Sequence, residues 1–162
     1  MHKVLTVVFC ALVSIWMQGQ QTNPITLQKQ LKEVDDTTKL RLLNELYQYY
    51  IVVNYDSALL FSQERKNIAE KLNDSVEIAN SIRSIGACYW TKGDTEKAFE
   101  YFTLALNKFI ESGYEPGIAS AYNNLGLVHY DFGNHSNALE YYLKALKIYE
   151  QLDNKKNIAA LC

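Results

Sequence analysis

The chain has 162 residues, which suits one domain, and its 48% hydrophobic and 21% charged content is that of an ordinary soluble globular protein. The formal net charge of −2 provides no basic excess for phosphate contacts, which argues against a nucleic-acid partner. Seven glycines and two prolines are too few for the tight turns of a many-stranded sheet, so the composition favours long helices joined by short loops.

The N-terminal segment is typical of a targeting signal. A short basic start at His2 and Lys3 precedes an uncharged, almost wholly apolar stretch over residues 4–17. A helix that spans a bilayer needs about 20 apolar residues, so this stretch is better suited to a secretory signal. We predict a signal peptide over residues 1–19 and a periplasmic or secreted protein, with an uncleaved N-terminal anchor as the alternative.

The next segment, residues 20–35, is predicted to hold a linker and a short lead-in helix over residues 27–34. Apolar residues then recur at helical spacing in three pairs of segments. Short polar or glycine-containing stretches separate them, and Asp94 and its equivalents Asn54 and Asn134 are suited to capping the helices that follow. The predicted helices span residues 37–53 and 55–72, 75–92 and 95–112, and 116–132 and 135–152, with a further helix beginning at residue 155.

An internal repeat with a period of 40 residues runs through this region. Small and aromatic positions recur at this offset, which chance does not explain. The matching positions are Ile78-Ala79 with Ile118-Ala119 and Ile158-Ala159, Gly86 with Gly126, Gly93 with Gly133, Ala98 with Ala138, Tyr101 with Tyr141, and Ala105-Leu106 with Ala145-Leu146.

The pattern within each repeat resembles the tetratricopeptide repeat (TPR). A large residue, a leucine-type residue, glycine and an aromatic mark the first helix of that family, and alanine, an aromatic and alanine mark the second. The matching residues here are Ile82, Ile85, Gly86, Tyr89, Ala98, Phe102 and Ala105, and then Tyr122, Leu125, Gly126, His129, Ala138, Tyr142 and Ala145. The resemblance implies an all-α, right-handed superhelical solenoid of antiparallel helix pairs over residues 36–162.

Two features depart from the usual family pattern. The period is 40 rather than 34 residues, as in the extended repeats of bacterial signalling proteins. The copy at residues 36–73 is degenerate, because Leu46 replaces glycine, and Ser62 and Arg65 replace the aromatic and the second alanine. Full copies follow at 74–113 and 114–153, and residues 154–162 are expected to begin an incomplete one.

No pattern of residues in the chain predicts catalysis. The sequence lacks a cysteine–histidine cluster at metal-ligand spacing, a glycine-rich phosphate loop and a nucleophile motif, so we expect no enzyme activity, metal or cofactor. His129 occupies a family tyrosine position and is interpreted as a packed histidine. Cys88 lies on an apolar helix face and is expected to be a buried thiol.

The resemblance also implies a concave groove lined by the first helix of each pair. Amides and aromatics dominate the positions carried over to it, and these side chains suit contact with a peptide. Packing of the aromatics between neighbouring repeats is the alternative role. The predicted partner-binding residues are Asn44, Tyr47, Asn80, Arg83, Trp90, Asn123, Asn124, Tyr130 and Asp131.

These observations favour a non-catalytic scaffold that binds a protein or peptide through the groove. The alternative is the N-terminal sensor segment of a larger signalling protein, either a membrane histidine kinase or a repeat-containing transcription regulator. An apolar stripe at the C-terminal edge would also be left open, which predicts self-association through that edge.

Overall fold

The computed structural model describes the backbone of residues 23–159 and the side chains of residues 23–153. The predicted signal peptide therefore lies outside the described residues. The chain divides into two compact units, residues 1–34 and residues 35–162. Among the described residues there is no strand, which confirms the all-α prediction.

The described part of the first unit contains one short helix, α2 (Pro24–Gln30). The lead-in helix was predicted to begin at residue 27, and this start is wrong. The Asn23 side chain accepts a hydrogen bond from the backbone N–H of Ile25, and Pro24 occupies the first turn, where its missing N–H has no cost. The helix therefore begins earlier than the apolar pattern indicates.

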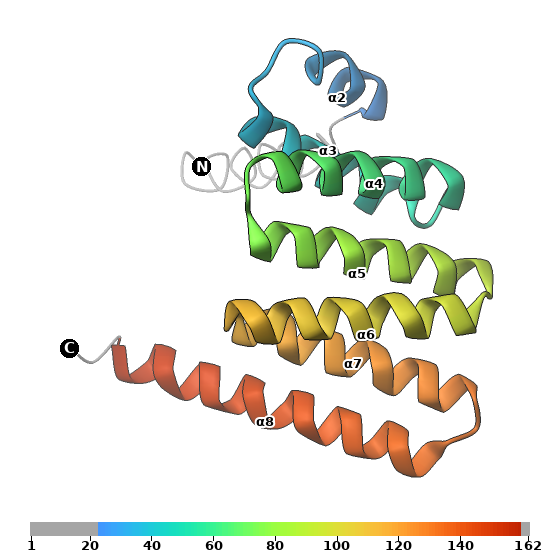
Figure 1. The fold of residues 1–162 in the computed structure, drawn as a ribbon, viewed down its shortest axis with the longest axis vertical. Helices are drawn as coiled ribbons and strands as arrows, with labels where there is room; N and C mark the ends of the chain where they lie inside the picture. The colour runs from blue at the N-terminus through green and yellow to red at the C-terminus, as the bar shows by residue number, and fades with distance from the viewer. Residues whose placement is uncertain (1–22, 160–162) are drawn as a thin grey trace, which may run out of the picture. The chain divides into compact units, whose positions relative to one another are not determined.

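The second unit is a stack of antiparallel helix pairs in which consecutive helices lie side by side (Figure 1). The 40-residue repeat is thus one helix–turn–helix unit, and the predicted helical solenoid is confirmed. The helices are α3 (Asp36–Tyr50), α4 (Tyr55–Lys71), α5 (Ser75–Lys92), α6 (Thr95–Ser112), α7 (Glu115–Asp131) and α8 (His135–Ala159).

Two of the three polar residues predicted to cap helices, Asn54 and Asp94, are confirmed as caps. Asn54 accepts from the backbone N–H of Ser57 at 3.1 Å, and Asp94 accepts from that of Lys97 at 3.1 Å. Gly93, just before Asp94, has a φ of 86°, a left-handed conformation that glycine adopts without a steric penalty. The turn between α5 and α6 is therefore determined by residues next to one another in sequence.

The last predicted turn is wrong, because α8 continues through Asp153 and Asn154 to Ala159. At the positions 40 and 80 residues earlier, Gly113 and Asn73 have left-handed backbone and end α6 and α4. Glycine and asparagine adopt that conformation more readily than other residues. Since each further helical residue adds a hydrogen bond, α8 extends at the point where this helix stop is missing.

Glycine and alanine lie where the two helices of a pair approach most closely. A Cβ atom added to Gly86 would lie 2.8 Å from Cδ1 of Phe102, and one added to Gly126 would lie 2.5 Å from Cε1 of Tyr142. The side chains of Ala98 and Ala105 are fully buried. The sequence positions assigned to close helix contact are therefore confirmed in both full repeats.

The first repeat reverses the sizes of the facing residues. Leu46 occupies the glycine position and Ser62 the aromatic position, and both side chains are fully buried. The Ser62 hydroxyl donates to the carbonyl oxygen of Ala58 at 2.9 Å, so its burial leaves no unpaired donor. By the 40-residue equivalence, a large residue on α3 and a small one on α4 occupy the space that glycine and an aromatic fill elsewhere.

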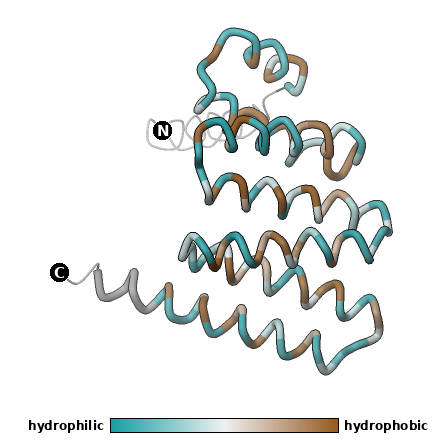
Figure 2. Tube along the Cα trace, viewed as in Figure 1, coloured by the Kyte–Doolittle hydropathy of each residue, from teal (hydrophilic) through white to brown (hydrophobic). Residues whose placement is uncertain are grey.

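Apolar residues alternate with polar ones along every helix of the second unit, as Figure 2 shows. A buried cluster is formed by α5, α6 and α7 and includes Ile82, Phe102, Phe109, Leu125 and Val128. This core fixes the rotation of α5 and α7, and thereby determines which of their side chains remain accessible.

Candidate interaction face of the first helices

One stripe of α5 remains accessible beside the core. Asn80, Arg83 and Ala87 are half-buried, and Trp90 is 38% exposed. Their spacing of three, four and three residues places them on one side of the helix. This is the stripe that the family resemblance assigned to the groove.

The equivalent stripe of α7 is more open. Asn123 and Asp131 are exposed, and Tyr130 is 60% exposed, with its ring centroid 5.1 Å from that of His135. Asn124 is half-buried, and its amide nitrogen is buried without a hydrogen-bond partner among the described residues. Because this nitrogen is buried, it is not accessible to a partner at the surface.

The two stripes form one continuous surface, because α5 and α7 contact each other. The indole Nε1 of Trp90 donates to Oδ2 of Asp131 at 2.6 Å, which links the C-terminal ends of the two helices. Trp90 therefore both bonds across neighbouring repeats and retains exposed aromatic surface. We call this surface the first-helix face and define it by Asn80, Arg83, Ala87 and Trp90 of α5 and Ser120, Asn123, Asn124, Leu127, Tyr130 and Asp131 of α7.

The burial of Tyr47 on α3 contradicts the prediction that this residue contacts a partner. That side chain is 5% exposed and belongs to a cluster with Ala58 and Cys88. Burial raises the pKa of the Tyr47 phenol, and the nearby Arg83 cation partly opposes this effect. A core tyrosine cannot contact a partner on the surface, so Tyr47 is a packing residue.

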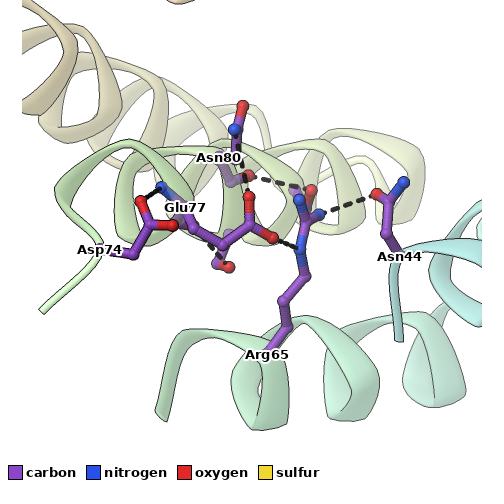
Figure 3. A network of polar contacts seen from close by, with 7 residues as sticks. Asn44, Arg65, Asp74, Glu77 and Asn80 are labelled. Carbon is purple, nitrogen blue, oxygen red and sulfur yellow. Dashed lines mark hydrogen bonds and ion pairs between the residues drawn. The ribbon is translucent and has the colours of Figure 1, made fainter. Parts of the chain in front are cut away.

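Asn44 and Asn80 belong to a polar network around the buried Arg65 (Figure 3). Arg65 Nη1 donates to the Asn44 amide oxygen at 2.8 Å, and Arg65 Nε pairs with a Glu77 carboxylate oxygen. Asn80 Nδ2 donates to the other Glu77 oxygen at 3.3 Å. The Asn44 bond joins α3 to α4 within the first repeat, and the Arg65–Glu77 pair joins that repeat to α5 of the next one.

The sequence pattern did not predict the ion pair between Arg65 and Glu77. The signal was the arginine at a family alanine position, because a buried guanidinium requires a carboxylate and further acceptors. Here Glu77 supplies the charge and Asn44 the additional acceptor.

Two charged side chains of the first-helix face, those of Arg83 and Asp131, lack, in the described part of the chain, an ion-pair partner such as Arg65 and Glu77 provide for each other. Neither Arg83 nor Asp131 forms an ion pair with the described residues, although Asp131 accepts from Trp90. Since Glu77 is neutralised by Arg65, one cation and one anion remain on this face for a partner.

His129 is packed, as predicted, and is not placed as a ligand. Its ring stacks on Tyr141 with centroids 5.1 Å apart and meets the ring of Phe99 edge-on at 5.6 Å. In the part of the chain that the structure describes, no three histidine, cysteine or acidic side chains gather as a possible metal site. No helix found there combines the length and the apolar character that crossing a bilayer requires.

Comparison with protein families identifies this architecture. Residues 77–151 match the family described as tetratricopeptide repeat, and residues 17–108, more than half of the chain, match the family described as SusR N-terminal TPR domain. The chain belongs to the TPR family. TPR domains are in general scaffolds for protein interaction, and this coarse role applies to the present TPR chain.

Solved structures show the same fold at low sequence identity. The TPR domain of Arabidopsis FLU aligns with a TM-score of 0.64 and 18% identity over 72% of this chain and 99% of that one. The apo form of RapI aligns with a TM-score of 0.71 and 23% identity, and BtubC (BKLC) from P. vanneervenii with 0.67 and 21%. These two alignments cover 91% and 80% of this chain but only 56% and 54% of the neighbours. A search of curated proteins found no match.

Proposed function

We propose that this TPR chain is a non-catalytic scaffold that binds a peptide or a partner protein on the first-helix face. The observation that supports it is the pair of matched accessible stripes on α5 and α7, with Asn123 exposed and Trp90 and Tyr130 retaining aromatic surface. Asparagine side chains donate to and accept from a peptide backbone, and tyrosine and tryptophan provide rigid contact area.

A selection with random peptides displayed on phage tests this proposal without knowledge of the natural partner. Enriched peptides are expected to lose affinity for the double variant Arg83→Ala/Asn123→Ala while its unfolding midpoint stays near that of the wild type. The matched control is Asn107→Ala/Lys147→Ala, which removes an amide and a cation from the second helices α6 and α8. Equal affinity for wild type and the first-helix double variant would contradict the proposal.

The second candidate function is a sensor segment at the N-terminus of a larger signalling protein. Its support is the match to a family described as the N-terminal TPR domain of SusR. A membrane histidine kinase or a repeat-containing transcription regulator would then provide the output. The intact mass of the native protein from its source cells distinguishes the two: a mass far above 18.6 kDa favours the sensor, and a mass somewhat below it favours the small scaffold.

We also propose an extracytoplasmic location, because residues 1–19 have the composition of a secretory signal. N-terminal sequencing of the native protein should then begin after that segment. A native N-terminus at Met1 in a cytoplasmic fraction would contradict this location.

A further inference from the structure

Helix α8 is the last layer of the second unit, and one side of it carries an apolar stripe that no other helix covers (Figure 1). Leu139, Leu143 and Leu146 are exposed, and their spacing of four and three residues places them on one side of the helix. Within the residues that the structure describes, no other helix of this unit has three exposed large apolar side chains at such spacing. We call these three leucines the α8 stripe.

The equivalent side of α6 shows what kind of element such a surface receives. By the 40-residue repeat, the α8 stripe corresponds to a side of α6 that α7 covers, with Leu139 at the position of Phe99. Phe99 contacts His129 near the end of α7, and Phe109 lies against Gly117 near its start. The helix that covers α6 is therefore antiparallel to it, and an antiparallel helix is also suited to the α8 stripe.

The charges beside the stripe indicate which helix this is. Glu140 and Lys147 are exposed, and they lie three residues before and four residues after Leu143, so both border the α8 stripe on the same side. Glu140 forms an exposed pair with Lys144 at 2.6 Å, whereas Lys147 forms no ion pair with the described residues. Helix α8 thus presents an anion and a cation along one edge of its apolar stripe.

Two α8 helices match each other when they run antiparallel. With Leu143 of one copy against Leu146 of the other, a two-fold axis passes between these residues. The same edge of each helix then meets that of the other, so Glu140 of each copy lies opposite Lys147 of the other. In a parallel pair the charged edge would instead meet the opposite edge of the second helix, which carries Tyr149.

We propose that two copies of this chain associate through an antiparallel pair of α8 helices, with the α8 stripes in contact and Glu140 of each copy beside Lys147 of the other. The two-fold symmetry uses the stripe of each copy once, so the assembly closes at the dimer. The stripe covers about two helical turns, so the interface is small, and we expect a dissociation constant in the micromolar range or above.

Charge reversal at the two edge residues tests this pairing. Each of the variants Glu140→Lys and Lys147→Glu places like charges opposite each other at both ends of the interface. The dissociation constant of each variant is expected to rise about ten-fold over that of the wild type. Sedimentation equilibrium of the full chain, at protein concentrations from about 1 to 1,000 µM, measures these constants.

Mixing the two variants distinguishes the antiparallel pair from other arrangements. In the mixed dimer opposite charges again face each other at both ends, so an equimolar mixture should associate about as tightly as the wild type. The double variant Glu140→Lys/Lys147→Glu should also recover the wild-type constant, because both pairs are present with their signs exchanged. In a parallel pair the charged edges do not meet, so the single variants would already match the wild type.

The matched control is Glu70→Lys on α4. It makes the same charge change as Glu140→Lys and breaks an exposed pair between residues four apart, that of Glu70 with Lys66 at 2.6 Å. This variant should dimerise as the wild type does. Circular dichroism establishes that each variant retains the helical content of the wild type.

Three results would overturn the inference. A wild-type chain that is monomeric at every concentration would leave the α8 stripe to a different protein. Association that continues beyond the dimer would assign the stripe to another surface of the second copy. Dissociation constants of Glu140→Lys and Lys147→Glu that equal the wild-type value, or that mixing does not restore, would exclude the antiparallel pairing of the two edges.

Discussion

Arg65 and Glu77 form a buried ion pair between the second helix of the first repeat and the first helix of the next, with side-chain exposures of 8% and 17%. The pair replaces an alanine contact of the other repeats, since Ala105 and Ala145 occupy the position of Arg65. Asn44 accepts one hydrogen bond from Arg65, and Asn80 donates one to Glu77.

Removing one member of this pair should destabilise the protein strongly. Arg65→Ala leaves the Glu77 carboxylate poorly solvated, and the free energy of unfolding is expected to fall by about 3 kcal/mol. Urea denaturation followed by circular dichroism measures the loss. Lys66→Ala, which breaks the exposed Lys66–Glu70 pair on the same helix, is the control and should cost less than about 0.5 kcal/mol. Equal effects of the two variants would contradict the structural role of Arg65.

The Tyr142 ring lies close to Gly126, so the effect of Gly126→Ala on stability is predicted to change sign when that ring is removed. In the wild type, Gly126→Ala should destabilise by about 1–2 kcal/mol, because crowding against the Tyr142 ring outweighs the helix propensity of alanine. In a Tyr142→Ala background the ring is absent, and the same substitution should stabilise by up to about 1 kcal/mol. Unfolding free energies of the four proteins in this cycle check it. A destabilising effect of equal size in both backgrounds would show that the ring is not the obstacle.

The Cys88 thiol predicts a loss of stability at alkaline pH. Burial raises its pKa from 9.0 to about 11, an effect that the hydrogen bond to Ser62 partly offsets. The thiol ionises at a lower pH in the unfolded chain than in the folded one. The stability that the buried neutral thiol contributes is therefore complete below pH 9 and is lost as the pH rises to 11. The loss amounts to about 3 kcal/mol.

The difference in unfolding free energy between the wild type and Cys88→Ala isolates this contribution, since the other alkaline titrations are common to both proteins. The advantage of the wild type over the variant should shrink between pH 9 and 11. A constant difference across this range would show that the folded and unfolded thiols have the same pKa.

The outer face of α8 predicts self-association. Leu139, Leu143 and Leu146 are 58%, 55% and 51% exposed. Their equivalents on α6 contact α7: Phe99 packs edge-on against His129, and Leu106 is 9% exposed in the core that α7 shares. An apolar stripe of this kind, left uncovered, favours association between copies.

Sedimentation velocity at increasing protein concentration should reveal this association. Leu143→Glu should abolish the concentration dependence, whereas Leu104→Glu, at a 43% exposed leucine on α6, should leave it unchanged. A wild-type protein that sediments as a monomer at every concentration would contradict the prediction.

Much of the fold could be predicted from local features of the sequence. The turn at Gly93 and Asp94 depends on residues next to one another in the chain, and the core positions of Ile82 and Ile85 follow from helical spacing. The glycine and alanine positions of close contact recur after 40 residues, so one repeat confirms the interpretation of the other.

The candidate site was predicted less completely. Trp90, Asn123 and Tyr130 lie on the accessible face as expected, since the helical period that buries Ile82 and Leu125 leaves these positions outside. Tyr47 was misplaced: it occupies the position of the half-buried Ala87 and Leu127, but its side chain is buried in a cluster with Ala58 and Cys88. The end of α8 was misplaced because the position equivalent to Gly113 is occupied by Asp153, which continues the helix.

The sequence by itself determined the helices, most of their turns, the 40-residue unit and the residues at which paired helices approach, because each depends on hydrogen bonds and burial patterns within about one turn or one repeat. Only the tertiary structure decided that Arg65 meets Glu77 and Asn44, that Trp90 bonds to Asp131 across 41 residues, and that Tyr47 is buried. These contacts depend on the rotation and offset of one helix against another, which side-chain packing fixes and no local pattern encodes.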